Sequence, residues 1–133
     1  APSERFVADF IGDTNFLDLT VASVTGDSAE VTLPGGKPVT ARLPEGLRPV
    51  LGETVTTVIR PEQAQMVAAG EGDLDGVVDS AVFFGTDTHV HLRLDDGQPF
   101  ILRRQNSAET IEPKPGTRMG LHLSPGALRV LKG

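Results

Sequence analysis

Short runs of alternating apolar and polar residues, separated by glycine and proline, make up most of the sequence. Alternation with a period of two is typical of strands that bury one face, and the glycines and prolines between the runs favour turns. The turn sequences Gly26-Asp27-Ser28, Pro34-Gly35-Gly36 and Asp95-Asp96-Gly97 suit backbone at positive φ. The pattern therefore predicts strands near residues 16–24, 30–33, 39–43, 54–59, 76–84, 88–94, 100–104 and 119–123.

One short helix is predicted, at the start of the chain. Ser3 is a suitable N-cap, and Gly12 is suited to end the helix. A helix this short is not stable alone in water, so its apolar face must dock on another surface. The side chains of that face are Phe6, Val7, Phe10 and Ile11.

The chain also contains an internal repeat. Gly36 matches Gly97 within one pair of similar stretches, and Pro61 matches Pro125 within a second pair that follows in the same order. The difference in residue number between matched residues is constant within each pair of stretches, and it is larger by three in the second pair. This places a three-residue insertion in the loop between 104 and 114. A repeat of about 60 residues buries little surface by itself, so the two repeats should pack together. Other matched pairs are Leu33 and Leu94, Arg42 and Arg103, Gly52 and Gly116, Val55 and Met119, and Ile59 and Leu123.

Composition narrows the functional classes. The 133 residues include no cysteine, which excludes disulfides and thiolate metal sites, and no apolar run approaches the ~20 residues needed to span a bilayer. The net charge is −6, with acidic residues spread along the chain and no tryptophan or tyrosine. An acidic chain without a basic stripe is a poor candidate for nucleic-acid binding, so no nucleic-acid partner is expected.

Motifs that carry catalytic chemistry are not found. Gly35-Gly36-Lys37-Pro38 lacks the earlier glycine and the following Ser or Thr of a phosphate loop, and is better interpreted as a hairpin turn. His89 and His91 share one face of a predicted strand with Arg93, which makes a solvated face a better interpretation than a metal site. We predict no catalytic, cofactor-binding or metal-binding residue.

Three segments together resemble a known family. Residues 6–17, Phe-Val-Ala-Asp-Phe-Ile-Gly-Asp-Thr-Asn-Phe-Leu, resemble the start of the C-terminal regulatory region of ABC importer ATP-binding subunits. The sequence Ile59-Arg60-Pro61-Glu62 resembles an element that ends the first β lobe in that family, and residues 126–131 resemble its usual tail. The spermidine/putrescine importer type is the most similar. The Ser-Ala-Arg-Asn stretch of molybdate-binding relatives does not occur here.

The resemblance implies an all-β fold with one short N-terminal helix: an OB-fold-like, transport-associated (TOBE) domain with two β lobes. Residues 1–12 would be the connecting helix from an ATPase domain that is not in this chain, and residues 13–133 the domain itself. Its lobes would cover about 13–69 and 70–133. No cofactor is expected in this fragment, because ATP and magnesium would bind the ATPase domain.

The expected function is regulation and dimerisation of an ABC importer subunit for a small solute, such as a polyamine, without catalysis. The partners would be its own ATPase domain, a second copy of the subunit, the permease subunits and a regulatory small ligand. The complex would lie in the cytoplasm at the inner membrane. The expected interface residues are Phe6, Val7, Phe10, Ile11 and Asn15. Two alternatives stay open: a free-standing OB-type module that binds an oligonucleotide or small ligand, and a small β-barrel hydrolase without an identified nucleophile.

Overall fold

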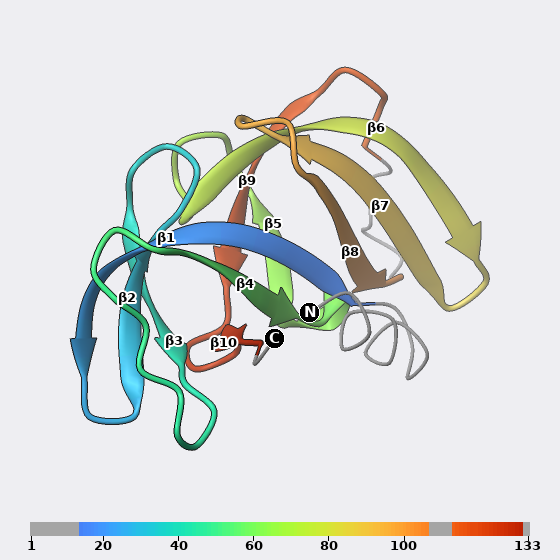
Figure 1. Cartoon of the computed structure of the whole chain (residues 1–133). Helices are drawn as coiled ribbons and strands as arrows, with labels where there is room; N and C mark the ends of the chain where they lie inside the picture. Colours follow the sequence, from blue (N-terminus) through green and yellow to red (C-terminus); the bar gives the residue numbers. More distant parts are fainter. Residues whose placement is uncertain (1–13, 107–112, 132–133) are drawn as a thin grey trace.

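A computed structural model describes residues 14–106 and 113–131 (Figure 1). Ten strands form two five-stranded sheets, a closed barrel with the order β1-β2-β3-β10-β4 and a second sheet with the order β5-β9-β6-β7-β8. One 3₁₀ turn, η1 (Pro61–Gln63), precedes β5. The strands are β1 (Asn15–Thr25), β2 (Ser28–Thr32), β3 (Pro38–Arg42), β4 (Thr54–Ile59), β5 (Ala64–Val67), β6 (Leu74–Phe84), β7 (Asp87–Leu94), β8 (Pro99–Gln105), β9 (Arg118–Leu123) and β10 (Arg129–Val130).

The two repeats exchange their last strands. β5 follows β4 in the chain but pairs with β9 of the second sheet, and β10 follows β9 but pairs with β4 of the barrel. The two exchanged strands pair in the same register. Gln65 lies opposite His122, and the residues that match them in the other repeat, Arg129 and Val58, also lie opposite each other. Because each sheet is completed by the other repeat, neither repeat can form its whole sheet alone.

Loop hydrogen bonds confirm the repeat. The Gly36 N–H donates to Leu33 O at 2.8 Å, and the Gly97 N–H donates to Leu94 O at 2.9 Å. Both glycines have a positive φ, 99° and 91°, which a residue with a side chain rarely adopts. The strands β1 and β6 also match, and each contains a register shift at the same place, between Val21 and Ser23 and between Val78 and Ser80.

The core follows the alternation along the strands. In β1 the buried side chains are Leu17, Leu19 and Val21, with exposed polar residues between them. One continuous cluster of buried apolar side chains joins the barrel to the second sheet. Phe100 is its largest fully buried side chain in the second sheet, together with the fully buried Leu92, Leu102 and Leu121. Burial of this shared cluster makes the two sheets one structural unit.

The matched hairpins differ in length. The pair Val24–Ala29 in the first repeat corresponds to Ala81–Val90 in the second. The β1–β2 hairpin ends one pair later, whereas the β6–β7 hairpin continues for three more pairs to Phe84 and Asp87. Its added residues carry exposed apolar side chains, and Figure 1 shows this hairpin projecting at one side of the molecule.

The all-β, two-part architecture and its barrel confirm the predicted fold class. All eight predicted strands occur, with ends shifted by a few residues, whereas the strands β5 and β10 were not predicted. The predicted helix and its side chains Phe6, Val7, Phe10 and Ile11 lie outside the described residues. Because β5 and β10 cross over, each sheet contains strands from both predicted lobes, about 13–69 and 70–133.

Candidate functional site

The two sheets meet at a junction that is built around Asn15, the first residue of β1. Asn15 is buried, and pairing with Ile59 at the end of β4 fixes its position. Its Nδ2 donates to Ile101 O at 2.8 Å, and the Ile101 N–H donates to its Oδ1 at 2.7 Å. The side-chain amide thus pairs with the edge of β8 as a peptide group of a neighbouring strand would. The predicted interface residue Asn15 therefore joins the two sheets, and its contact with an ATPase domain stays a prediction.

Two further junction contacts come from one position of the repeat. Lys37 and Gln98 are matched residues, and each follows the glycine of a hairpin turn. Lys37 Nζ donates to Asp73 Oδ1 at 2.7 Å, next to the start of β6. Gln98 Nε2 donates to Asp18 O at 3.2 Å, and its Oε1 accepts from the Asp18 N–H at 2.8 Å. Each hairpin turn thus reaches a residue of the other repeat.

Asp73 is the most strongly engaged carboxylate of the junction. Besides Lys37, its Oδ2 accepts from the Leu123 N–H at 2.8 Å and lies 3.4 Å from His122 Nδ1. Partial burial is the largest single influence and raises the pKa of Asp73. The hydrogen bonds from Lys37 and from the Leu123 N–H, with the charges of Lys37 and His122, outweigh it and leave the pKa below its ordinary value. The ionised form of Asp73 is therefore favoured in the folded protein.

The largest of the described grooves lies between β8 and the segment of η1 and β5. In the barrel, the corresponding seam is closed, since Arg42 pairs with Arg129 and the Arg42 N–H donates to Leu128 O at 2.9 Å. In the second sheet, β5 and β8 are not paired, which leaves a groove of about 640 Å³. An ion pair of 3.6 Å between Arg103 and Glu62 spans it. Its lining residues are Glu62, Ala64, Gln65, Met66, Asp87, Leu102, Arg103, Arg104 and Gln105.

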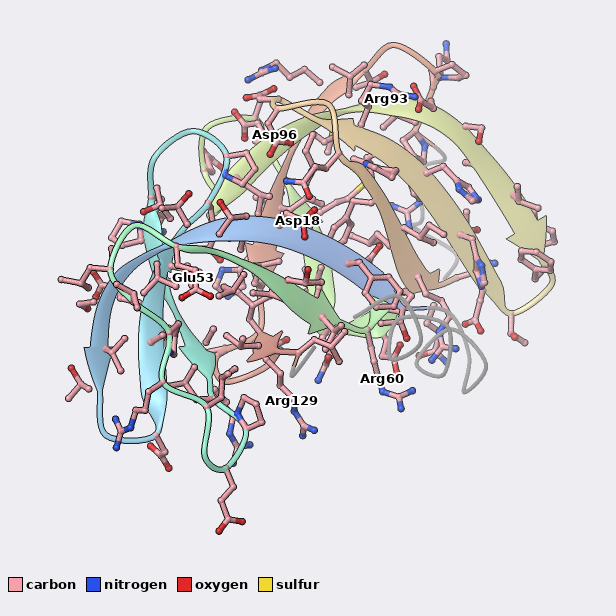
Figure 2. All side chains as sticks on the ribbon, in the orientation of Figure 1. Asp18, Glu53, Arg60, Arg93, Asp96 and Arg129 are labelled. Atoms are coloured by element: carbon pink, nitrogen blue, oxygen red, sulfur yellow. The ribbon has the colours of Figure 1, made fainter. Side chains whose placement is uncertain are left out.

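A smaller groove, of about 270 Å³, lies at the end of the barrel. Arg60 and Arg129 line it together with Gln63, Ala127 and Val58. Figure 2 shows Arg60 and Arg129 on the same side of the molecule, with their side chains pointing away from the strands. Within the described residues neither guanidinium forms an ion pair. This groove therefore has a positive rim.

Catalytic and metal chemistry finds no support in the described ranges. No group of three His, Asp or Glu side chains there could hold a metal ion. His89 packs against Phe84, with ring centroids 4.5 Å apart, and Arg93 lies 3.6 Å from Asp79. No helix in residues 14–106 and 113–131 has the length and apolar character to cross a bilayer.

Within residues 14–106 and 113–131, the fold is an all-β domain of two sheets whose last strands are exchanged between the repeats. The sequence profile of the TOBE domain matches residues 57–131, more than half of the chain. The chain therefore belongs to the TOBE domain family, which confirms the resemblance noted above.

Longer curated relatives extend this match. The chain is 50% identical over 109 residues to the spermidine/putrescine import ATP-binding protein PotA of Ruegeria pomeroyi, covering 82% of the chain and 29% of that protein. It is 39% identical over 132 residues to PotA of Mesorhizobium japonicum, covering 98% of the chain and 35% of that protein. The maltose/maltodextrin import ATP-binding protein MalK of Mannheimia succiniciproducens is 30% identical, covering 98% and 36%. The chain thus spans about a third of the length of these relatives.

Solved structures share the fold, among them a molybdate-binding protein. The cytoplasmic molybdate-binding protein ModG superposes with a TM-score of 0.70, covering 86% of this chain and 92% of that one. The sequence identity is 18%, so the likeness supports the architecture alone.

Proposed function

We propose that this chain is the regulatory and dimerisation domain of an ATP-binding subunit of an ABC importer, with a polyamine as the imported solute. The observation that carries the proposal is the 50% identity to a spermidine/putrescine import ATP-binding protein over most of the chain. The matched profile is that of the TOBE domain, so the ATPase chemistry with ATP and magnesium would belong to the rest of a longer protein. The partners would then be that ATPase domain, a second subunit and the permease, at the cytoplasmic side of the inner membrane.

The mechanism would be allosteric and not catalytic. A domain that is attached to each of two ATPase domains changes their closure if a ligand or partner favours one arrangement of the pair. The groove between η1, β5 and β8 is the candidate place for a regulatory small ligand, because the equivalent seam of the barrel is closed. The strand exchange supports transmission between the two sheets, since β5 and β10 each connect one repeat to the sheet of the other.

A chimera tests the proposal. The matching segment of the Ruegeria pomeroyi PotA protein is replaced by this chain, and spermidine uptake is measured in cells without their own importer. We expect uptake within a few-fold of the intact protein. The matched control carries the corresponding segment of the maltose/maltodextrin import protein MalK, which should give lower uptake if the domain is adapted to its own subunit. Loss of uptake with this chain, in a chimera that assembles normally, would contradict the proposal.

The isolated chain supplies a second test. Calorimetry with Mg-ATP should show no binding, because the sequence lacks a phosphate loop with its lysine and following Ser or Thr. Micromolar binding would overturn the assignment of nucleotide chemistry to another part of the protein.

A further inference from the structure

The projecting β6–β7 hairpin carries an unusual run of exposed apolar residues. Val82, Phe83 and Phe84 keep 41%, 66% and 59% of their surface exposed. No charged residue occurs from Ser80 to Phe84. The corresponding hairpin of the first repeat ends at Thr25 and has no counterpart of the two phenylalanines. Exposed apolar surface on this hairpin, absent from the matched β1–β2 hairpin, indicates a contact specific to the β6–β7 hairpin.

The backbone of β6 is also open on one side. β9 pairs with β6 from Leu74 to Val77, and the loop before β9 binds both backbone groups of Val78. Beyond the register shift, β6 pairs with β7 alone within the described residues. Figure 1 shows β6 on the outer side of the hairpin. With respect to residues 14–106 and 113–131, the last residues of β6 therefore form a free strand edge, which proteins usually protect with charges, proline or a covering segment.

The register tells which backbone groups point outward. The backbone N–H and C=O groups of Ile101 both bind the Asn15 side chain, so they point away from His91, the residue opposite on β7. The backbone groups of His91 therefore point to the other side, toward Ser80 on β6. Groups of successive strand residues point to alternate sides. Ser80, Val82 and Phe84 therefore face β7, while Ala81 and Phe83 direct their N–H and C=O groups to the open side.

This edge is complementary to itself. We propose that two copies of the chain pair antiparallel through β6, with the two-fold axis at Val82. Ala81 of each copy then lies opposite Phe83 of the other, and their backbone groups form four hydrogen bonds that use every outward group of both residues. On the other face, Phe84 of each copy lies beside Ser80 of the other, and the two Val82 side chains meet at the axis. The inference rests on the dimerisation in the proposed function and names its surface.

The charge distribution favours a second copy as the occupant. The chain carries a net charge of −6, and two such chains repel each other wherever their acidic surfaces meet. The uncharged stretch from Ser80 to Phe84 avoids that repulsion. Five residues per copy bury much less than the ~800 Å² per partner of a standard interface, so the pairing should be weak in the isolated chain. Attachment to ATPase domains that associate during transport would strengthen it through a high effective concentration.

Cross-linking provides a direct test, because the chain has no cysteine. In a non-hydrogen-bonded antiparallel pair, opposite Cα atoms lie ~4.5 Å apart, within the range of a disulfide. Val82→Cys should therefore form a disulfide-linked dimer under mild oxidation at least ~10-fold faster than Val50→Cys, whose parent valine is 69% exposed on a loop of the first repeat. Valine and cysteine are similar in size, so the fold should tolerate both changes. Equal rates for the two variants would overturn the proposal.

Sedimentation of variants separates the surface from dimerisation itself. Val82→Lys places two ammonium groups at the axis and should weaken self-association at least ~10-fold, whereas Val50→Lys should leave it unchanged. Self-association that survives Val82→Lys would overturn the β6 surface and leave dimerisation standing. If the wild type stays monomeric and Val82→Cys does not cross-link, the β6 surface is overturned, while dimerisation and membership of an importer are tested separately by sedimentation and uptake of the chimera.

Discussion

Asn15 and Gly72 occupy the same position in the two repeats, ahead of the buried apolar residues of the matched strands β1 and β6. One position holds a polar side chain that bridges the sheets, and the other has no space for a side chain. Asn15 fills its position with an amide that binds the edge of β8. At Gly72 there is no room for a side chain, since a Cβ would lie 2.4 Å from Leu121 O. The backbone frame of the repeat is thus retained, while side chains at matching positions have diverged according to what the other repeat places opposite them.

The same divergence separates the two seams and the two hairpins. The barrel is closed by β10 against β3, whereas the second sheet is left open between β5 and β8. The first hairpin is short, and the Arg48 side chain binds its turn at Gly26 O. The second hairpin is longer and apolar at its tip. We conclude that the barrel is the more closed structure and that the second sheet carries the open groove and the β6 edge.

The largest expected effect compares matched core positions. Phe100 is almost fully buried in the second sheet, and its match Val39 is partly buried in the barrel. Phe100→Ala should lower the free energy of unfolding by about 3–5 kcal/mol, and Val39→Ala by about 1 kcal/mol. Urea unfolding followed by circular dichroism measures both. Because the sheets share strands and a core, each variant should unfold in one transition; two separate transitions would show that the repeats are independent.

Smaller changes are expected at the position of Asn15 and Gly72. Asn15→Ala leaves the partly buried edge of β8 without partners at Ile101 and should cost about 2 kcal/mol. Gly72→Ala forces a backbone shift against Leu121 and should cost about 1–3 kcal/mol. Gln98→Ala, which removes an exposed amide of the same junction, is the control and should cost below about 1 kcal/mol. An Asn15→Ala variant as stable as the control would show that the amide is not what joins the sheets.

The smallest effect is a dependence of stability on pH. The folded pKa of Asp73 lies below its ordinary value of 3.8, so its contribution is complete above that pH and is lost as the pH falls through the folded pKa. Lys37→Met should lower stability at pH 7 by about 1 kcal/mol or less and flatten the decline that occurs below about pH 4. Gln98→Met, at the matched position, should leave the acid decline unchanged. Equal acid profiles for the two variants would remove the distinction between the two hairpin turns.

Local patterns were sufficient to predict most of the strands. Alternation marks a strand with one buried face wherever the strand is long enough, as in β1 and β7. β5 and β10 have four and two residues, too few for a period to emerge. The sequence also marked Asn15 only through a resemblance, since nothing near it in the chain predicts that its amide binds Ile101, 86 residues away.

The sequence by itself determined the fold class, the internal repeat and the family, because turn glycines, alternation and ordered matched segments are local features. Only the tertiary structure decided which sheet each final strand joins. The repeats are alike, so their strands could complete either sheet, and the choice depends on the packing of both together. The unpaired seam between β5 and β8 and the β6 edge, which has no second partner within the described residues, were also decided by the tertiary structure. A strand that lacks a neighbour has the same sequence pattern as a strand that has one.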